Sequence, residues 1–458
     1  MQRRTFFKLA GLGTTAALGA PLVRGADAVA IRTGCVGEPA RDLPLAGEAD
    51  VIVCGAGPAG VAAALGAARK GAKTLLIETH GCLGGVWTAG ALSWILDSAN
   101  KTGLMAELWQ ALEQRGARDL TSKGKGTNAY DTEAMKLLLE DLCTGAGVEV
   151  RLHTRVCAAL KTAAGRMEYV VTESKSGREA WRGKIFVDCS GDGDLAAQAG
   201  CGFDLGHPET KLTQPMSLMA LVAGLVPGEI VEYYHSEETA ANWGATKDKL
   251  RAEMERGGHS PSYAKPTLFH IRGDLFALMA NHEYEVLGTS AADITRATLR
   301  ARKELNQLID GLRGLGGVWK NLRLVVTAEQ IGVREGRRIH GLYTLTTDDL
   351  REGRRHADAV CRATFGIDVH ATNPKREKGI EKAGFRPKPY DIPLRALIAK
   401  DVGGLLMAGR CISGDFLAHS SYRVTGNAVA MGEAAGKVAA TAAKTNRLPQ
   451  DVKLEEAG

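Results

Sequence analysis

Three glycines and one glutamate, spaced as Gly55, Gly57, Gly60 and Glu78, are the residues of this chain whose pattern points most clearly to a chemistry. The first glycine permits a tight turn, the second lets the backbone approach a pyrophosphate, and the third lets a helix pack closely on a strand. A carboxylate about twenty residues further on can bind a ribose hydroxyl. These residues therefore predict a site for a dinucleotide.

The segments around these four residues have the patterns that such a site requires. Residues 50–54 are predicted as a buried strand, residues 58–70 as a helix of small residues, and residues 73–77 as a second strand that leads into Glu78. The N-terminus of a helix offers free N–H groups and a partial positive charge to phosphates. Glycine spacing alone is a weak signal, but this strand–turn–helix–strand context makes an ordinary glycine-rich turn the minor alternative.

The composition indicates a globular protein with more than one domain. At 458 residues the chain is too long for one simple core. The net charge of +6 is spread thinly, so we expect no nucleic-acid partner. The nine cysteines form no CxxC pair and the eleven histidines lack ligand spacing, so we expect neither a disulfide framework nor a metal site.

The first 30 residues are predicted to be an export signal, followed by a linker over residues 31–48. Arg3 and Arg4 precede a mildly apolar stretch that is too short and too weakly apolar to span a membrane. Residues 2–8 resemble a twin-arginine signal, which implies a periplasmic or otherwise exported protein that folds before transport. A basic, disordered N-terminus is the alternative.

The rest of the chain is predicted to form an α/β fold that is split in sequence. Three strand-like runs form a β-meander that leads into Gly191 and Asp192, where backbone N–H groups could meet an anion. Longer helical patterns then indicate an inserted domain, before a buried strand and a helix of small residues return to the first domain. The runs of the meander are 148–160, 167–173 and 179–187, and the longer helices are 237–256 and 291–315. The predicted domains are 49–204 (nucleotide-binding, first part), 205–395 (substrate or cap, α+β) and 396–445 (nucleotide-binding, second part), with a tail over 446–458.

This order of elements resembles the flavin-dependent oxidoreductases of the glutathione-reductase-type FAD fold. Local sequences strengthen the resemblance. Gly84-Gly85-Val86-Trp87-Thr88 follows the Glu78 strand, Asp188-Cys189-Ser190-Gly191-Asp192 follows the meander, and Arg423-Val424-Thr425-Gly426-Asn427-Ala428 leads into the first residues of the last helix, predicted from about Gly426 to Ala442. The match is to the broad FAD-dependent oxidoreductase family, which is related to fumarate-reductase-like flavoproteins. It implies FAD as the cofactor, in a Rossmann-like FAD-binding domain, and leaves the substrate open.

The resemblance also implies a role for each matching residue. The pyrophosphate is expected at the glycine-rich turn and the adenosine ribose at Glu78, while Val156 offers backbone to the adenine and Asn427 and Ala428 face the pyrimidine of the flavin. Glycines and polar residues of the other loops are expected along the ribityl chain and the phosphates. The complete set expected to bind FAD is Gly55, Gly57, Pro58, Ala59, Gly60, Glu78, Gly84, Gly85, Thr88, Val156, Gly191, Asp192, Gly409, Arg410, Asn427 and Ala428.

Four residues are candidates for catalysis. His419 could relay a proton near neutral pH, and Arg423 matches an arginine that holds a substrate carboxylate in fumarate-reductase-like relatives. Arg334 and His370 belong to the inserted domain and could close over a substrate. A solvated charged face is the alternative for Arg334, and a structural histidine is the alternative for His370.

The function these residues favour is hydride transfer between a small organic substrate, a carboxylate or a sugar derivative, and flavin N5. The electron donor or acceptor that completes the cycle is left open. One alternative is a nicotinamide-only dehydrogenase, which would not need the segment from Gly409 to Asn427. Another is a non-catalytic FAD-binding protein, whose flavin no substrate would reduce.

Overall fold

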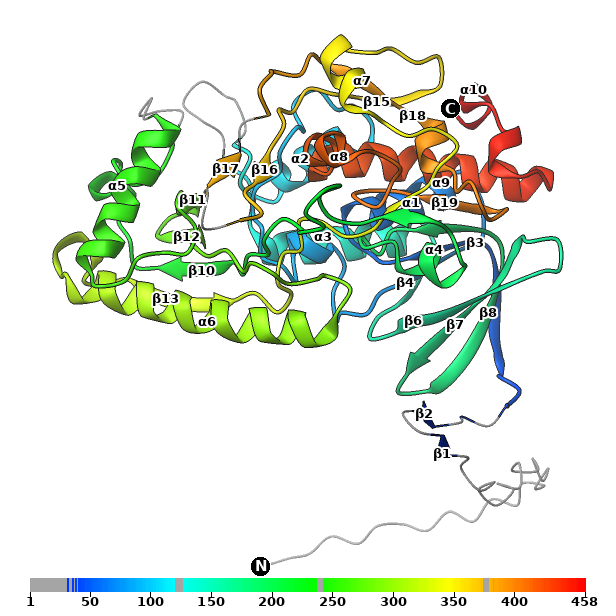
Figure 1. Ribbon diagram of the computed structural model, residues 1–458, viewed down its shortest axis with the longest axis horizontal. Helices are drawn as coiled ribbons and strands as arrows, with labels where there is room; N and C mark the ends of the chain where they lie inside the picture. Colours follow the sequence, from blue (N-terminus) through cyan, green and yellow to red (C-terminus); the bar gives the residue numbers. More distant parts are fainter. Residues whose placement is uncertain are drawn as a thin grey trace, which may run out of the picture. The chain divides into compact units, whose positions relative to one another are not determined.

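A computed structural model of the chain describes residues 40–119, 127–236, 242–373, 379–381 and 383–458, together with residues 31–32, 35–36 and 38 (Figure 1). The chain forms two compact units that divide after Leu43. In the first unit the short strands β1 (Ile31–Arg32) and β2 (Cys35–Val36) pair antiparallel. The predicted export signal lies outside the described residues.

A parallel sheet forms the centre of the second unit. Its strands run in the order β5 (Glu149–Arg151), β4 (Thr74–Ile77), β3 (Leu45–Cys54) and β8 (Gly177–Asp188), and β19 (Leu405–Met407) pairs with the end of β8. Val51, Ile52 and Val53 have no exposed surface, as expected for a parallel strand that is covered on both faces. The predicted strand over residues 50–54 is confirmed, but it begins earlier, because Leu45 pairs with Ala180 inside the predicted linker.

The register of this sheet brings the ends of four strands together. Cys54 lies beside both Ile77 and Asp188, and Asp188 lies beside Met407. The loops that follow β3, β4, β8 and β19 therefore leave the sheet at the same edge, which is where open α/β sheets bind their ligands.

The meander forms as predicted except at its first strand. The strands β6 (Arg155–Lys161), β7 (Met167–Ser174) and β8 pair antiparallel. The predicted run 148–160 is wrong as one strand, because the backbone N–H of Thr154 donates to the carbonyl oxygen of Glu78 and His153 has a φ of 51°. The chain thus leaves the parallel sheet after β5 and turns before β6.

Two helices of small residues pack against each other over the parallel sheet. They are α1 (Pro58–Arg69) and α9 (Thr425–Thr445), which lie near the two ends of the second unit in sequence and side by side in the fold (Figure 1). A methyl group on Gly432 would overlap the carbonyl oxygen of Ala59, and a methyl group on Gly436 would overlap that of Ala63. Glycine at these positions lets the two backbones approach closely.

A four-stranded antiparallel sheet forms the core of the inserted region. Its order is β11 (Thr267–Arg272), β12 (Leu275–Met279), β10 (Ala220–Ala223) and β13 (Arg323–Thr327). The helices α5 (Trp243–Arg256) and α6 (Ala291–Gly314) pack against it, close to the predicted helices over 237–256 and 291–315. Its apolar residues form a cluster separate from that of the parallel sheet. The predicted domain boundaries themselves stay predictions.

The remaining elements are shorter or lie on the outside of these two sheets. The side chain of Asp131 caps α3, as predicted, by accepting hydrogen bonds from the N–H groups of Glu133 and Ala134. No helix among the described residues combines the length and the apolar character needed to cross a membrane. The other helices are α2 (Leu104–Gln114), α3 (Thr132–Gly145), α4 (Asp194–Gln198), α7 (Thr347–Glu352), α8 (Phe416–Tyr422) and α10 (Leu454–Ala457), and the paired short strands are β9 (Phe203–Asp204) with β14 (Arg338–Ile339), β15 (Ala359–Ala363) with β18 (Tyr390–Pro393), and β16 (Val369–His370) with β17 (Ile380–Glu381).

Candidate active site

A cavity of about 530 Å³ lies at the carboxyl edge of the parallel sheet. The loops after β3, β4, β8 and β19 all line it, together with the start of α9 and residues of the inserted region. Its size lies within the range of about 300–1,000 Å³ that is typical of ligand sites. The cavity therefore joins the predicted nucleotide-binding loops to the inserted region.

The three glycines after β3 differ in what surrounds them. Gly55 has a φ of 95°, and a methyl group on it would contact the backbone of Cys189. A methyl group on Gly60 would overlap the carbonyl oxygen of Gly55. A methyl group on Gly57 would meet no atom within 4 Å, although Gly57 lines the cavity. Only Gly57 of the three thus leaves open space for a ligand, as a pyrophosphate requires.

Glu78 stands at the end of β4 and lines the cavity. Its carboxylate accepts hydrogen bonds from the N–H of Ala56 at 2.6 Å and from the N–H of His80 at 2.9 Å. Each carboxylate oxygen keeps capacity for a further donor, so Glu78 is held in place with an acceptor available to a ribose hydroxyl.

The loop after β8 brings an ion pair to the cavity. Asp192 Oδ1 lies 2.9 Å from Arg410 Nη2, and both residues line the cavity with Gly191. Burial raises the pKa of Asp192, although the charge of Arg410 opposes that shift. Gly191 contacts the same guanidinium, since a methyl group on it would lie 2.5 Å from Arg410 Nη1. The pair fixes the loops after β8 and β19 against each other.

The first turn of α9 reaches the cavity through Thr425 and Ala428. Asn427 does not line the cavity: its side chain has no exposed surface, and its amide has no hydrogen-bond partner among the described residues. The first turn of α9 thus reaches the cavity with Thr425 and Ala428, and not with the side chain of Asn427.

Other residues predicted to bind the cofactor divide into two groups. Pro58, Ala59, Gly85, Val156 and Gly409 line the cavity. Gly60, Gly84 and Thr88 do not line it. Gly84 has a φ of 106° and its N–H donates to the carbonyl oxygen of Ala56, while the hydroxyl of Thr88 donates to the carbonyl oxygen of Leu83 at 2.5 Å. Both of these residues support the wall from behind.

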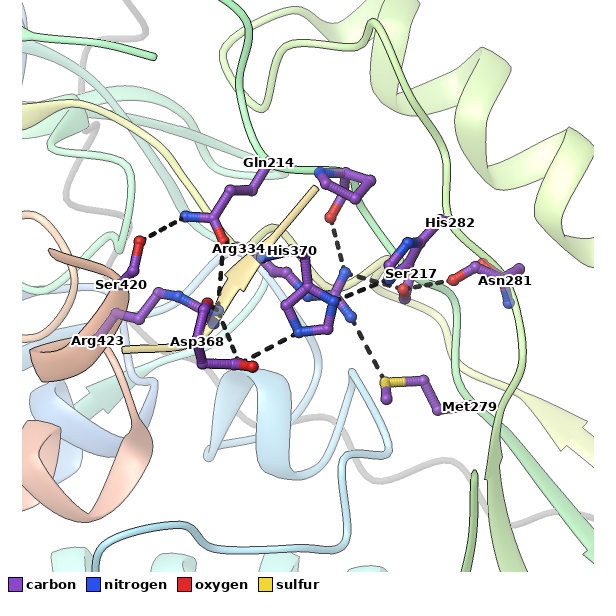
Figure 2. Close-up of polar contacts among 11 residues, drawn as sticks. Gln214, Ser217, Met279, Asn281, His282, Arg334, Asp368, His370, Ser420 and Arg423 are labelled. Atoms are coloured by element: carbon purple, nitrogen blue, oxygen red, sulfur yellow. Dashed lines mark hydrogen bonds and ion pairs between the residues drawn. The ribbon is translucent and has the colours of Figure 1, made fainter. Parts of the chain in front are cut away.

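Arg334 is a cation at the cavity wall that has no acidic partner among the described residues. Its Nη1 donates to the carbonyl oxygen of Pro215 at 2.7 Å and to the hydroxyl of Ser217 at 2.9 Å, and its Nη2 lies 3.5 Å from the sulfur of Met279 (Figure 2). No described carboxylate lies within ion-pair distance of it. Burial and the nearby charge of Arg423 lower the pKa of Arg334 to about 10, so the side chain remains charged at neutral pH.

Arg423 also lines the cavity, but its charge is matched. Its Nη2 donates to the backbone oxygen of Asp368 at 2.8 Å and to the carboxylate of Asp368 at 3.1 Å. Burial would raise the pKa of Asp368, but the positive groups around it, including Arg423 and Arg334, hold that pKa well below its usual range. Arg334 is therefore the cation of this group whose charge is not balanced.

His370 lies behind the cavity wall, in a chain of hydrogen bonds (Figure 2). Its Nε2 is 3.2 Å from Asp368 Oδ2 and its Nδ1 is 3.0 Å from His282 Nε2. Beyond the residues drawn there, His282 Nδ1 is 3.1 Å from the hydroxyl of Tyr284. Because Asp368 can only accept, His370 donates from Nε2 and accepts at Nδ1. His282 then donates from Nε2 and accepts from Tyr284.

The imidazoles of His370 and His282 are both neutral at physiological pH. Burial, with the charge of Arg334, lowers the pKa of His370 to about 4, although Asp368 opposes that shift. Burial, with Arg334 and His370, lowers the pKa of His282 as well. Neutral imidazoles leave the carboxylate of Asp368 free to balance Arg423.

His419 is enclosed behind the site. It has no exposed surface, does not line the cavity, and neither ring nitrogen has a hydrogen-bond partner among the described residues. Burial and the charges of Arg338, Arg423 and Arg410 lower its pKa well below the ordinary value. The structure gives it no contact with the cavity through which it could relay a proton.

Several residues of the site were not predicted from the sequence. Leu92, Trp94 and Leu96 line the cavity and alternate with the buried residues Ala91 and Ile95. Ala91 and Ile95 are as apolar as the lining residues, so no alternation of residue types marked this segment in the sequence. The partners Asp368 and His282 carried no signal either, because they meet His370 only through the tertiary fold.

The fold and the cavity define this protein as an α/β protein of the dinucleotide-binding class, with one ligand site lined by both ends of the second unit. The model of the FAD dependent oxidoreductase family matches residues 50–457, so the chain belongs to that family. It is an oxidoreductase with FAD as its cofactor. The open space at Gly57, the free acceptor of Glu78 and the start of α9 at the same cavity fit that cofactor.

Solved structures with a similar fold are distant in sequence. A geranylgeranyl bacteriochlorophyll reductase-like protein from Thermoplasma acidophilum is 14% identical, with 90% of this chain and 82% of that chain covered and a TM-score of 0.43. A flavin-dependent brominase is 14% identical, with 87% and 80% covered and a TM-score of 0.49. A p-nitrophenol 4-monooxygenase from Pseudomonas putida is 11% identical, with 89% and 83% covered and a TM-score of 0.45. No curated protein matches the sequence. These similarities are too low to transfer an activity to this chain.

Replacement of Gly57 by valine tests where the pyrophosphate binds. The new side chain meets open space rather than protein, so we expect folded protein that no longer retains FAD. The measurement is the FAD content of the purified protein together with its urea unfolding midpoint after removal of flavin. The control is Gly145→Val. Gly145 lies outside the cavity, and a side chain there also meets open space, so this variant should keep its FAD. Wild-type FAD content in Gly57→Val would contradict the placement.

Replacement of His282 by glutamine tests the protonation states of the imidazole pair. An imidazole whose pKa is lower in the folded than in the unfolded chain binds more protons when unfolded, so stability is lost as pH falls from about 6.5 toward 4. Glutamine can keep both hydrogen bonds but cannot titrate. We expect a smaller loss of unfolding free energy between pH 7 and pH 5 in the variant than in the wild type, measured by urea unfolding. The half-exposed His340→Gln serves as control, and equal losses in all three proteins would contradict the assignment.

Proposed function

We propose that this FAD-dependent oxidoreductase transfers hydride between flavin N5 and a small organic substrate that carries a negative charge. The observation that supports this most directly is the position of Arg334 at the wall of the cavity that the predicted cofactor loops line, with no carboxylate partner among the described residues. A buried charge is costly unless an opposite charge compensates it. An anionic substrate supplies that compensation.

In this proposal the cofactor carries the redox chemistry, accepting or donating hydride at N5. The guanidinium of Arg334 binds the anionic group of the substrate and orients the substrate, since its donors have a fixed planar geometry. Arg423 lies at the same wall and is held by Asp368, which limits its rotation. The chain from Asp368 through His370 to His282 is a positioning network, because none of these three residues lines the cavity.

The two alternative functions are less well supported. A nicotinamide-only enzyme would not require the C-terminal part of the site, in which Gly409, Arg410 and Ala428 line the same cavity as Gly57. A non-catalytic flavoprotein would not require an unbalanced cation beside the cofactor. The sequence predicted a carboxylate or a sugar derivative as the substrate. The charge of Arg334 supports an anionic group on the substrate and does not choose between these two classes.

The test of this proposal is a screen of organic acids for anaerobic bleaching of the bound flavin, followed by the variant Arg334→Gln. A lost charge-assisted hydrogen bond costs about 1.5–3 kcal/mol, so kcat/KM should fall roughly ten- to a hundredfold. FAD content should be unchanged. Arg423→Ala should likewise keep FAD and lose turnover.

The matched control is Arg296→Gln, which removes an exposed arginine paired with Asp293 on α6. It should behave as wild type. Wild-type turnover in Arg334→Gln with every acid that bleaches the flavin would contradict the proposed role of the guanidinium.

We also propose that the protein is exported by the twin-arginine route, on the basis of Arg3, Arg4 and the apolar stretch that follows them. Replacement of both arginines by lysine should retain the protein, with its FAD, in the cytoplasm. Cell fractionation with the wild-type chain as control measures this. Equal periplasmic amounts of both proteins would contradict the proposal.

A further inference from the structure

One face of the four-stranded antiparallel sheet of the inserted region, called the cap below, forms an apolar wall around Arg334. Along the chain that enters β10, Leu218 and Ala220 are fully buried in the core of the cap, whereas Ser217 and Met219 alternate with them and line the cavity. Met279 at the end of β12 lines it too, and its sulfur lies 3.5 Å from Arg334 Nη2. A ligand whose anionic group lies on Arg334 therefore has apolar side chains directly beside that group.

A second apolar wall comes from the nucleotide-binding part. The side chains of Leu92, Trp94 and Leu96 line the cavity from one extended segment. The ring of Trp94 is held by Phe269 of β11 at 5.1 Å and by Trp243 of α5 at 5.6 Å between centroids. Aromatic rings fixed in this way present a rigid apolar surface to a ligand.

The hydroxyl of Ser217 beside Arg334 is already engaged, and Gln330 at the cavity wall offers one side-chain oxygen without a partner among the described residues, which is far fewer than a polyhydroxylated ligand needs. The hydroxyl of Ser217 donates to the carbonyl oxygen of Asn281 at 2.5 Å and accepts from Arg334. Substrate hydroxyls buried against the methionines and leucines would lack hydrogen-bond partners, which is unfavourable. A sugar or sugar acid therefore fits this surface poorly.

The two arginines that line this end of the cavity differ in their partners. Arg423 is balanced by Asp368, and Arg334 is not balanced by any described carboxylate. The one guanidinium of this pair that lacks a described carboxylate is matched to one anionic group on a ligand. A second negative charge would lie against apolar side chains without compensation.

We infer that the substrate is a monoanionic organic acid with an apolar body, whose anion lies on Arg334 and whose body lies along Met219, Met279 and Trp94. The inference rests on the proposed function, which requires only an anion, and it selects apolar acids over the sugar acids that the proposed function leaves open.

The test is calorimetric titration of the FAD-loaded protein with benzoate, cyclohexanecarboxylate, gluconate and phthalate. We expect the two apolar monoanions to bind with a Kd at least about tenfold lower than gluconate and phthalate. Arg334→Gln should weaken the binding of benzoate about tenfold or more. Met279→Gln, which places an amide on the wall, should weaken benzoate several-fold and bring gluconate closer to it. Arg296→Gln should change none of these values.

The outcomes separate this inference from the function on which it rests. If gluconate binds as tightly as benzoate, the inference that the ligand has an apolar body is wrong, while the anion site at Arg334 stands. If phthalate binds as tightly as benzoate, the inference that the ligand carries a single negative charge is wrong. If Arg334→Gln binds all four acids as the wild type does, or if the wild type binds none of them, both the inference and the anion-binding function are wrong.

Discussion

The close contact between α1 and α9 is the interaction on which the rest of the site depends. Gly432 and Gly436 bring the backbone of α9 against the carbonyl oxygens of Ala59 and Ala63 on α1. Because a close-packed interior has no room for even one extra methyl group at such a contact, the distance between these helices is fixed. The start of α9 is thereby held at the same cavity as the glycine-rich turn.

From that contact the chemistry of the cavity follows in two steps. The nucleotide-binding part supplies the loops at the carboxyl edge of the parallel sheet, and the cap lays one sheet face and Arg334 over them. Neutral imidazoles at His370 and His282 leave Asp368 to balance Arg423, so that Arg334 keeps its charge for a ligand. The site thus combines a redox cofactor with an apolar surface and a cation, Arg334, that no described carboxylate pairs with.

The sequence predicted best what local physical chemistry determines. The strand before Gly55, the helix from Pro58 and the cap at Asp131 depend on neighbouring residues, and the structure confirms them. The break between β5 and β6 was missed because it depends on a hydrogen bond from Thr154 to a residue 76 positions earlier, Glu78.

Residues of the candidate site could be predicted from the sequence only where a motif determines the backbone conformation. Gly57 lines the cavity as expected, whereas Thr88 supports the wall from behind and His419 is enclosed, because neighbouring positions on one loop or helix face different ways. The pairing of Asp368 with Arg423 and the alternation around Trp94 depend on segments that meet only in the folded chain. These contacts lie beyond the reach of sequence patterns.

The most direct test of the central claim, that both ends of the second unit form one cradle for FAD, is a crystal structure of the protein purified with its cofactor. We expect the pyrophosphate at hydrogen-bond distance from the N–H of Gly57, and the flavin ring between Thr425 and the face of the cap that carries Arg334. A nucleotide bound away from Gly57, or a flavin ring that does not reach the start of α9, would contradict the account.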